Sequence, residues 1–241
     1  MIKYLIKVSY DGSKFYGFQR LNKLATIQKT IEDALKIIFK EEVLVKGAGR
    51  TDKGVHALDQ AISFDAPFKV NCLDLKKAIN RYVGPYIKVN KVLKKDEDFH
   101  ARFSVKEKLY VYKINTGDYN PLLQDYMYQP KFNISIKKLR EASKIFLGLH
   151  DFKNFVSGEH SNTISNISDI KISKLNDIIN ISIRGKAFYK YMVRNIVGAL
   201  LDFNKGKITV DGLRKMLNEP DIRHQLTTSP PNGLYLAKIY Y

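Results

Sequence analysis

The order of polar and apolar residues between positions 2 and 93 is the feature that most restricts the fold of this chain. Residues 2–10 alternate between apolar and polar side chains, as in a half-buried strand, and Thr26 can cap a helix with apolar residues at helical spacing. The expected elements are strand 2–10, helix 27–39, strands 42–46 and 61–65, helix 73–82 and strand 87–93. This order predicts a split βαβ, ferredoxin-like half with antiparallel neighbours.

The second half repeats this alternation of strands and helices without repeating the sequence. Its expected elements are strand 108–115, helix 138–149, the strand pair 166–173 and 177–183, helices 187–203 and 210–217, and strand 234–241. We therefore predict an α+β fold of two ferredoxin-like halves, whose mainly antiparallel sheets lie side by side with an active-site cleft between them. A polar stretch around residue 96 is the expected hinge, so the halves are residues 1–96 and 97–241.

The charge of the chain indicates an anionic partner. Its 241 residues carry 41 Lys and Arg against 24 Asp and Glu, a net charge of +17, and nucleic acid is the commonest partner of so basic a protein. Lysine outnumbers arginine several-fold, so a coding bias with solvated lysines is the alternative explanation for part of this charge.

Several classes of site are not supported by the sequence. The single cysteine, Cys72, excludes an intramolecular disulfide and a cysteine-based metal cluster, and the histidines show no metal-ligand spacing. No apolar run approaches the ~20 residues of a membrane span, and the N-terminus has no signal-like apolar segment. We expect a reduced, cytoplasmic protein that needs no metal and no membrane.

A glycine-rich stretch, Gly47-Ala48-Gly49-Arg50-Thr51-Asp52-Lys53-Gly54, lies between two expected strands. Its three glycines allow sharp turns, and a loop of this kind on a rigid sheet presents polar side chains such as Arg50 and Asp52 over a cleft. The alternative on residue types alone is a connecting loop whose Arg and Asp pair at the surface.

The order of residues favours the first interpretation. The stretch Gly49-Arg50-Thr51-Asp52-Lys53-Gly54-Val55-His56-Ala57 resembles the catalytic loop of the TruA family of tRNA pseudouridine synthases. Four further segments match that family in the same order, namely Tyr10-Asp11-Gly12-Ser13-Lys14-Phe15-Tyr16-Gly17-Phe18-Gln19-Arg20, Asp98-Phe99-His100-Ala101-Arg102-Phe103-Ser104 with Tyr110-Val111-Tyr112, Met192-Val193-Arg194-Asn195-Ile196-Val197-Gly198, and Gly233-Leu234-Tyr235-Leu236. The resemblance covers nearly the whole chain.

The resemblance implies three catalytic residues. Asp52 takes the place of the family's catalytic aspartate, which either attacks C1′ of the sugar or removes a proton from C2′. Tyr110 matches the active-site tyrosine, which stacks on the uracil, and its hydroxyl can help to remove the C5 proton. Arg194 is implied to pair with Asp52. From residue types alone, a buried structural ion pair is a fair alternative for Arg194, and a place in the core is a fair alternative for Tyr110.

The same resemblance implies a set of RNA contacts. Arg50 is expected to fill the space left by a flipped nucleotide, and the candidates for phosphate and sugar contacts are Lys14, Arg20, His100 and Arg102. For each of these residues a plain surface charge is the alternative. Ser165 stands where the family usually carries Arg, which bears on the choice of RNA.

The implied function is isomerisation of uridine to pseudouridine in tRNA, at positions 38–40 of the anticodon stem-loop. The reaction needs no cofactor, and the family is dimeric, so a homodimer is expected. The alternatives are the same chemistry on another RNA such as ribosomal RNA, and a non-catalytic RNA-binding module. A glycosidase is less well supported, because no second carboxylate stands out as its acid and base.

Overall fold

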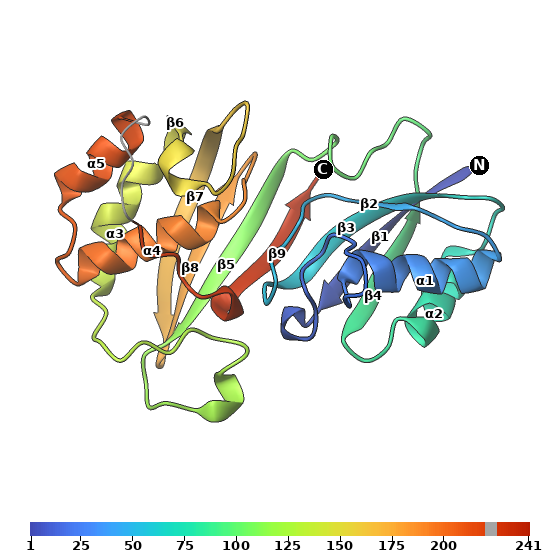
Figure 1. Ribbon diagram of the computed structural model, residues 1–241, viewed down its shortest axis with the longest axis horizontal. Helices are drawn as coiled ribbons and strands as arrows, with labels where there is room; N and C mark the ends of the chain where they lie inside the picture. Colours follow the sequence, from blue (N-terminus) through green and yellow to red (C-terminus); the bar gives the residue numbers. More distant parts are fainter. Residues whose placement is uncertain (220–225) are drawn as a thin grey trace. The chain divides into compact units, whose positions relative to one another are not determined.

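The computed structural model describes residues 1–219 and 226–241. The chain forms two compact units, one made of Met1–Lys106 with Tyr235–Tyr241 and the other of Glu107–Leu234. Each unit combines helices with a sheet (Figure 1). We refer to them as unit 1 and unit 2.

Unit 1 has its long strands at the centre of its sheet. Its elements are β1 (Ile2–Tyr10), α1 (Ile27–Phe39), β2 (Val45–Gly47), β3 (His56–Ala66), α2 (Cys72–Tyr82), β4 (Ile87–Lys94) and β9 (Leu234–Tyr240). Strand β1 lies between β4 and β3 and is antiparallel to both. Strand β3 also pairs antiparallel with β2 near one end and parallel with β9 near its start, at His56 and Ala57. The last strand of the chain therefore belongs to the sheet that the first strand begins.

Helix α1 shows how local sequence and burial agree in unit 1. Thr26 caps the helix, since its hydroxyl accepts a hydrogen bond from the backbone N–H of Lys29 at 3.4 Å. The apolar side chains at helical spacing, Ile27, Ile31 and Leu35 among them, are buried. Helices α1 and α2 pack against each other (Figure 1). Both helices and the strands of this unit lie where the sequence predicts them, to within a few residues.

Unit 2 is built on four antiparallel strands in the order β5-β8-β7-β6. Its elements are β5 (Glu107–Asn115), α3 (Ile136–Ser143), β6 (Gly148–Asp151), β7 (Ile164–Leu175), β8 (Ile178–Gly185), α4 (Met192–Asn204) and α5 (Val210–Asn218). Helices α3 and α4 pack against each other, and α3 also packs along β7. The prediction of a mixed fold with mainly antiparallel strands is confirmed.

Two predicted helices have the wrong bounds. The helix expected over 138–149 ends at Ser143, because Gly148 has a φ of +96° and residues 148–151 pair with β7 as a strand. The helix expected over 187–203 begins only at Met192. The residues before it bond elsewhere: the N–H of Lys186 donates to the carbonyl of Asn166, and the carbonyl of Lys190 accepts from Ser157.

The division between the units falls at Lys106, whereas the sequence places it at residue 96. The segment after β4 is fastened to unit 1. The N–H of Lys95 donates to the carbonyl of Lys3, and Ala101 is buried, with its N–H donating to Ser63 Oγ at 3.2 Å and its carbonyl accepting from the Tyr241 hydroxyl at 2.8 Å. The polar residues around position 96 are therefore exposed residues of unit 1 and not a boundary between the units. The chain leaves unit 1 ten residues later, after Lys106.

A close approach of backbones in unit 2 depends on Gly198 in α4. A Cβ at this position would lie 1.6 Å from the carbonyl oxygen of Thr227, which no real contact permits. We expect Gly198→Ala to lower the free energy of unfolding by roughly 3 kcal/mol, because the helix and the 227–229 segment must separate. Urea unfolding followed by circular dichroism measures the effect.

The matched control is Gly212→Ala in α5, where the nearest atom to the added Cβ is a side-chain methyl of Ile208 at 3.1 Å and no backbone atom is in the way. Its stability should change by less than about 1 kcal/mol, since the gain in helix propensity offsets the tighter packing. Equal effects of the two substitutions would contradict the importance of the close approach.

Candidate active site

Residues 48–55, here called the Asp52 loop, connect β2 to β3, and the start of the loop is hydrogen-bonded to the sheet. The N–H of Ala48 donates to the carbonyl of Ala61 at 2.8 Å, and the side-chain amide of Gln60 donates to the carbonyl of Gly49 at 2.9 Å. A tight turn follows Asp52, with Gly54 at a φ of +81°. As a result Asp52 is half-buried, while Arg50 is exposed.

The segment after β1 braces the Asp52 loop from the side. The N–H of Phe18 donates to the carbonyl of Thr51 at 3.0 Å, and the hydroxyls of Thr51 and Tyr10 are hydrogen-bonded at 2.8 Å. A Cβ on Gly12 would lie 2.0 Å from the carbonyl oxygen of Val55, so only glycine fits this contact. The backbone on both sides of Asp52 is thereby held in one position, as a reacting carboxylate requires.

Tyr10 is a buried member of this brace. Its burial raises the pKa of the phenol to about 12, against the opposing effect of the hydrogen bonds from Thr51 and Gln60. The hydroxyl is therefore neutral at physiological pH. It serves as a structural hydrogen-bonding group for Thr51, the residue before Asp52.

His56, at the start of β3, joins the Asp52 loop to two other segments. Its Nδ1 accepts a hydrogen bond from the N–H of Gly12 at 3.1 Å, and its ring stacks on Tyr235 of β9 with centroids 4.6 Å apart. Asp11 Oδ1 lies 3.4 Å from the same nitrogen but takes hydrogen bonds from Ser13. The backbone donor requires a lone pair on Nδ1, so we assign the neutral ring with its proton on Nε2.

Tyr110 lies in unit 2 on the buried face of β5, together with Tyr112. The ring of Phe188 meets it edge-on, with centroids 5.0 Å apart. Ser165 of β7 is buried, and its hydroxyl donates to the carbonyl of Ala187 at 2.6 Å. The serine therefore fixes the backbone beside Phe188, and through Phe188 it supports the tyrosine ring.

Arg194 lies in the first turn of α4 and is only half-buried. Its Nε donates to the carbonyl of Ser229 at 2.7 Å, the N–H of Ser229 donates back to the Arg194 carbonyl at 3.1 Å, and the guanidinium lies 4.7 Å above the Tyr191 ring. These contacts hold the guanidinium in a fixed orientation.

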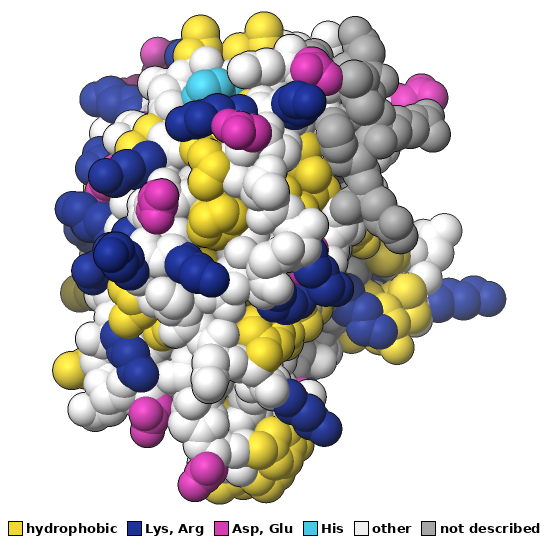
Figure 2. Space-filling model, turned by 90° about the vertical axis from the view of Figure 1, so that its left-hand side faces the viewer, with side chains coloured by type: hydrophobic (Ala, Val, Ile, Leu, Met, Phe, Trp, Pro, Cys, Tyr) yellow, Lys and Arg dark blue, Asp and Glu magenta, His cyan; other side chains and the backbone are white. Residues whose placement is uncertain are grey.

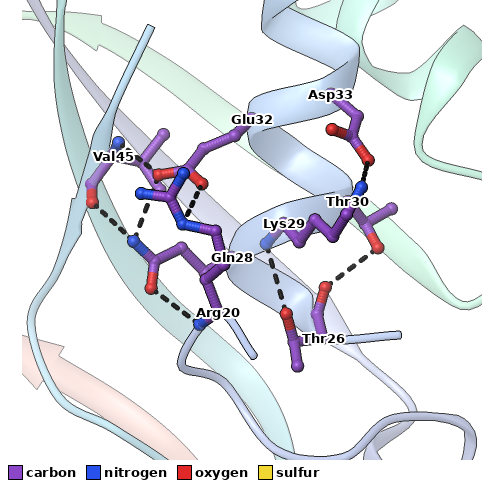
Figure 3. Close-up of polar contacts among 8 residues, drawn as sticks. All are labelled: Arg20, Thr26, Gln28, Lys29, Thr30, Glu32, Asp33 and Val45. Atoms are coloured by element: carbon purple, nitrogen blue, oxygen red, sulfur yellow. Dashed lines mark hydrogen bonds and ion pairs between the residues drawn. The ribbon is translucent and has the colours of Figure 1, made fainter. Parts of the chain in front are cut away.

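The predicted RNA contacts in the N-terminal segment differ in their surroundings. Lys14 and Arg50 have exposed side chains. Arg20 is exposed as well, but its Nε lies 3.4 Å from Oε2 of the buried Glu32 (Figure 3). The other oxygen of this carboxylate, Oε1, accepts hydrogen bonds from Gln28 and from the N–H of Val45. Arg20 is thus a partner of a buried carboxylate as well as a candidate for contact with RNA.

His100 and Arg102 lie on a short turn in unit 1. Nδ1 of His100 accepts hydrogen bonds from the N–H groups of Arg102 at 3.0 Å and Phe103 at 3.4 Å. Partial burial, and then the charges of Lys46, Lys3 and Arg102, lower the pKa of His100 below its usual value. The lowered pKa favours the neutral imidazole, in which Nδ1 keeps the lone pair that accepts these two hydrogen bonds.

Sequence reasoning missed the residues that support the site. His56 lies within the motif of the Asp52 loop, at the start of a buried strand, and this position is the one feature of the sequence that could have indicated a supporting role. The 227–230 segment, which contacts Arg194, carries no recognisable pattern, so no signal connected it to α4.

The comparisons with known proteins agree with the order of these segments. A family model described as tRNA pseudouridine synthase matches residues 6–104 and 142–241. The chain belongs to this family. Relatives named "tRNA pseudouridine synthase A" include those of Pseudothermotoga lettingae, 38% identical over 99% of both chains, and Thermosipho melanesiensis, 34% identical over the whole of both. A third, from Mycoplasma genitalium, is 36% identical over 100% of this chain and 99% of its own.

The predicted membership of the TruA family of tRNA pseudouridine synthases, and with it the class of RNA-modifying isomerase, is confirmed by these matches. Among residues 1–219 and 226–241 there is no group of three or more His, Cys, Asp or Glu side chains that could hold a metal ion. None of the helices in these residues is long and apolar enough to cross a bilayer.

Tyr10→Phe tests the brace of the Asp52 loop through its pH dependence. Below pH 10 we expect the variant to be about 1 kcal/mol less stable, because Thr51 loses its hydrogen-bond partner. Since the pKa of Tyr10 is raised from 10.0 to about 12 on folding, its stabilising contribution is lost as the pH rises between these values. The deficit of the variant should therefore shrink and reverse above about pH 11.

The measurement is urea unfolding at several pH values between 8 and 11.5. Tyr16→Phe, which removes the hydroxyl from an exposed ring of the same unit, is the control. A difference between Tyr10→Phe and wild type that stays constant over this range, or the same trend in Tyr16→Phe, would contradict the assignment.

Proposed function

We propose that this protein isomerises uridine to pseudouridine in the anticodon stem-loop of tRNA, on its 3′ side, with Asp52 as the catalytic carboxylate. The observation that carries the proposal is the match to tRNA pseudouridine synthases along the chain, combined with a half-buried aspartate on a braced loop in the matching segment. The net charge of +17 suits a polyanionic substrate.

The chemistry balances without any other reactant. The N1–C1′ bond of uridine breaks, the uracil rotates, a C5–C1′ bond forms, and the C5 proton is lost while N1 gains a proton. Asp52 either attacks C1′ and forms a sugar ester, which the uracil later displaces, or takes the C2′ proton and returns it. Both routes need an ionised carboxylate held close to the sugar, and the braced loop supplies the fixed backbone for it.

We assign Arg194 as the partner that keeps Asp52 ionised. Its Nε is engaged by the Ser229 carbonyl, so the pairing would use the Nη groups of a guanidinium already fixed by Tyr191. Tyr110 would stack on the uracil, and its hydroxyl would help to remove the C5 proton. The buried ring of Tyr110, supported by Phe188, is suited to such a role.

The remaining assignments follow from the same proposal. Arg50 would replace the flipped nucleotide in the stack, and Lys14, Arg20, His100 and Arg102 would contact the RNA backbone. Two ferredoxin-like halves would enclose the cleft, and a homodimer would let one copy support the tRNA while the other acts on it. A tRNA substrate would also place the protein in the cytoplasm.

The direct test is incubation of the purified protein with an unmodified tRNA transcript that has uridines in the anticodon arm. Pseudouridine is mapped by carbodiimide-dependent stops of reverse transcription. We expect stops in the anticodon arm for wild type and at least a ~10³-fold lower rate for Asp52→Asn, because the amide can neither attack C1′ nor accept a proton. Asp33→Asn, a surface carboxylate of α1 that is paired with Lys29, should behave as wild type (Figure 3).

The other outcomes separate the competing functions. Stops on ribosomal RNA but none on tRNA would keep the chemistry and replace the substrate, an alternative raised by the serine at position 165 in place of the family's usual arginine. Release of free uracil would indicate a glycosidase. Salt-dependent binding without modification of either RNA would indicate a non-catalytic binding module, and a fully active Asp52→Asn would remove Asp52 from the mechanism.

Two tyrosines on one strand give a matched pair of variants. Tyr110→Phe keeps the ring and removes the hydroxyl, so we expect kcat to fall about 10²-fold with KM little changed. Tyr112 donates its hydroxyl to the carbonyl of Pro230 at 2.9 Å and is fully buried. Tyr112→Phe should therefore cost about 1 kcal/mol of stability and leave kcat within a few-fold of wild type.

Single-turnover rates on the tRNA transcript and urea unfolding measure the two effects separately. If Tyr112→Phe lost as much kcat as Tyr110→Phe, the assignment of Tyr110 to the C5 proton would fail.

A further inference from the structure

Phe103 of unit 1 is exposed to an unusual degree for so large an apolar side chain. Its exposed fraction is 77%. The His100 ring lies against it, with centroids 4.3 Å apart and planes at 34°, and the Arg102 guanidinium lies 5.8 Å from its centroid. Three planar groups therefore lie together at the surface, and we call them the Phe103 platform.

The platform is held by a closed turn. The His100 nitrogen accepts from two backbone N–H groups of the turn, the N–H of Ser104 donates to the His100 carbonyl at 3.0 Å, and Ser104 Oγ accepts from the His100 N–H at 3.2 Å. Ala101, in the middle of the turn, is buried and bonded to Ser63 and Tyr241. The backbone that carries Phe103 is therefore already ordered before a partner binds, which lowers the entropic cost of binding.

The charges that act on His100 of the platform are positive. Lys46, Lys3 and Arg102 are close enough to lower the pKa of His100, although Lys3 is also paired with Asp65 at 2.9 Å. An apolar surface intended for a protein partner usually has a core poor in charge, whereas single-stranded nucleic acid is bound by exposed aromatic rings beside cations. The surroundings of Phe103 match the second kind of surface.

We propose that Phe103 stacks on an unpaired base of the RNA substrate, while Arg102 and Lys46 contact the phosphates that flank it. Stacking on Phe103 adds a binding site for the RNA beyond the uridine that reacts. The assignment rests on the proposed function in one respect only, which is that the RNA is tRNA. Unpaired bases are available in the loops of tRNA, and every base has a face that can stack on a phenyl ring.

The test compares three variants by fluorescence anisotropy with an end-labelled, unmodified tRNA transcript at several salt concentrations. Phe103→Leu removes the aromatic face and keeps apolar volume, so Kd should rise about tenfold with the slope of log Kd against log salt unchanged. Phe103→Tyr keeps the ring and should bind within about twofold of wild type. Arg102→Gln should lower the salt slope, since a phosphate contact is lost.

The matched control is Tyr82→Leu at the end of α2. Tyr82 is also exposed, at 44%, and has the Arg81 guanidinium 6.0 Å from its ring, so it resembles the platform in composition. Its removal should leave Kd unchanged. Thermal unfolding of each variant verifies that the fold is kept.

An unchanged Kd for Phe103→Leu, an equal loss in Tyr82→Leu, or a Tyr variant as weak as the Leu variant would each overturn the proposal. A change of oligomeric state in Phe103→Leu, measured by light scattering, would overturn it in favour of a contact between two copies. If wild type made no pseudouridine but Phe103→Leu still weakened tRNA binding, the proposed reaction would fail and the platform would stand.

Discussion

The position of Asp52 in unit 1 depends on a buried histidine that is not itself a candidate for the chemistry. His56 accepts a hydrogen bond from the backbone of Gly12 and stacks on Tyr235, so it joins the turn after β1, the end of the Asp52 loop and the last strand. A buried backbone N–H without an acceptor is costly, and the neutral imidazole supplies that acceptor. The absence of a side chain at Gly12 lets the two segments touch.

In unit 2, the position of Arg194 depends in a similar way on contacts with a distant segment, residues 227–230. Thr227 lies against Gly198, and the Thr228 hydroxyl donates to Asn195 Oδ1 at 2.7 Å. Ser229 exchanges two hydrogen bonds with Arg194, and Pro230 accepts the Tyr112 hydroxyl. The motif around Arg194 therefore includes two residues that hold the 227–230 segment against α4. Gly198 lets Thr227 approach the helix, and Asn195 accepts the hydrogen bond from Thr228.

Local signals in the sequence predicted much of the fold. The cap at Thr26 and the alternation in β1 act within a few residues, so α1 and β1 lie where they were expected. The errors arose where distant segments decide the structure. Pairing of β6 with β7 ends α3 early, and bonds from Lys186 and Lys190 to other segments delay the start of α4. Composition alone does not report such partners.

In the candidate site, too, residues within local motifs were predicted, whereas contacts between residues far apart in the sequence were not. Asp52, Tyr110 and Arg194 were predicted as site residues because each stands in a motif with a recognisable order. The supports of these residues were not found, because the contacts of Gly12 with His56 and of Ser229 with Arg194 join positions that are 44 and 35 residues apart. A sequence motif therefore indicates a candidate for the reaction more readily than it indicates the residues that hold that candidate in place.

The scarcity of arginine is a weaker guide to function than the motifs are. In a lysine-rich chain an arginine is favoured where a planar donor is needed, and the structure shows that such places are not restricted to a candidate active site. Arg140 donates two hydrogen bonds to the carbonyl of Ile172, and Arg184 pairs with Glu107; both are structural uses of the guanidinium fork. Arg194 also makes a structural contact, its hydrogen bond to the Ser229 carbonyl. It differs from Arg140 and Arg184 only in the motif that contains it. An arginine in this chain therefore indicates that a planar donor is needed at its position. Whether the arginine belongs to the candidate site is indicated by the motif around it.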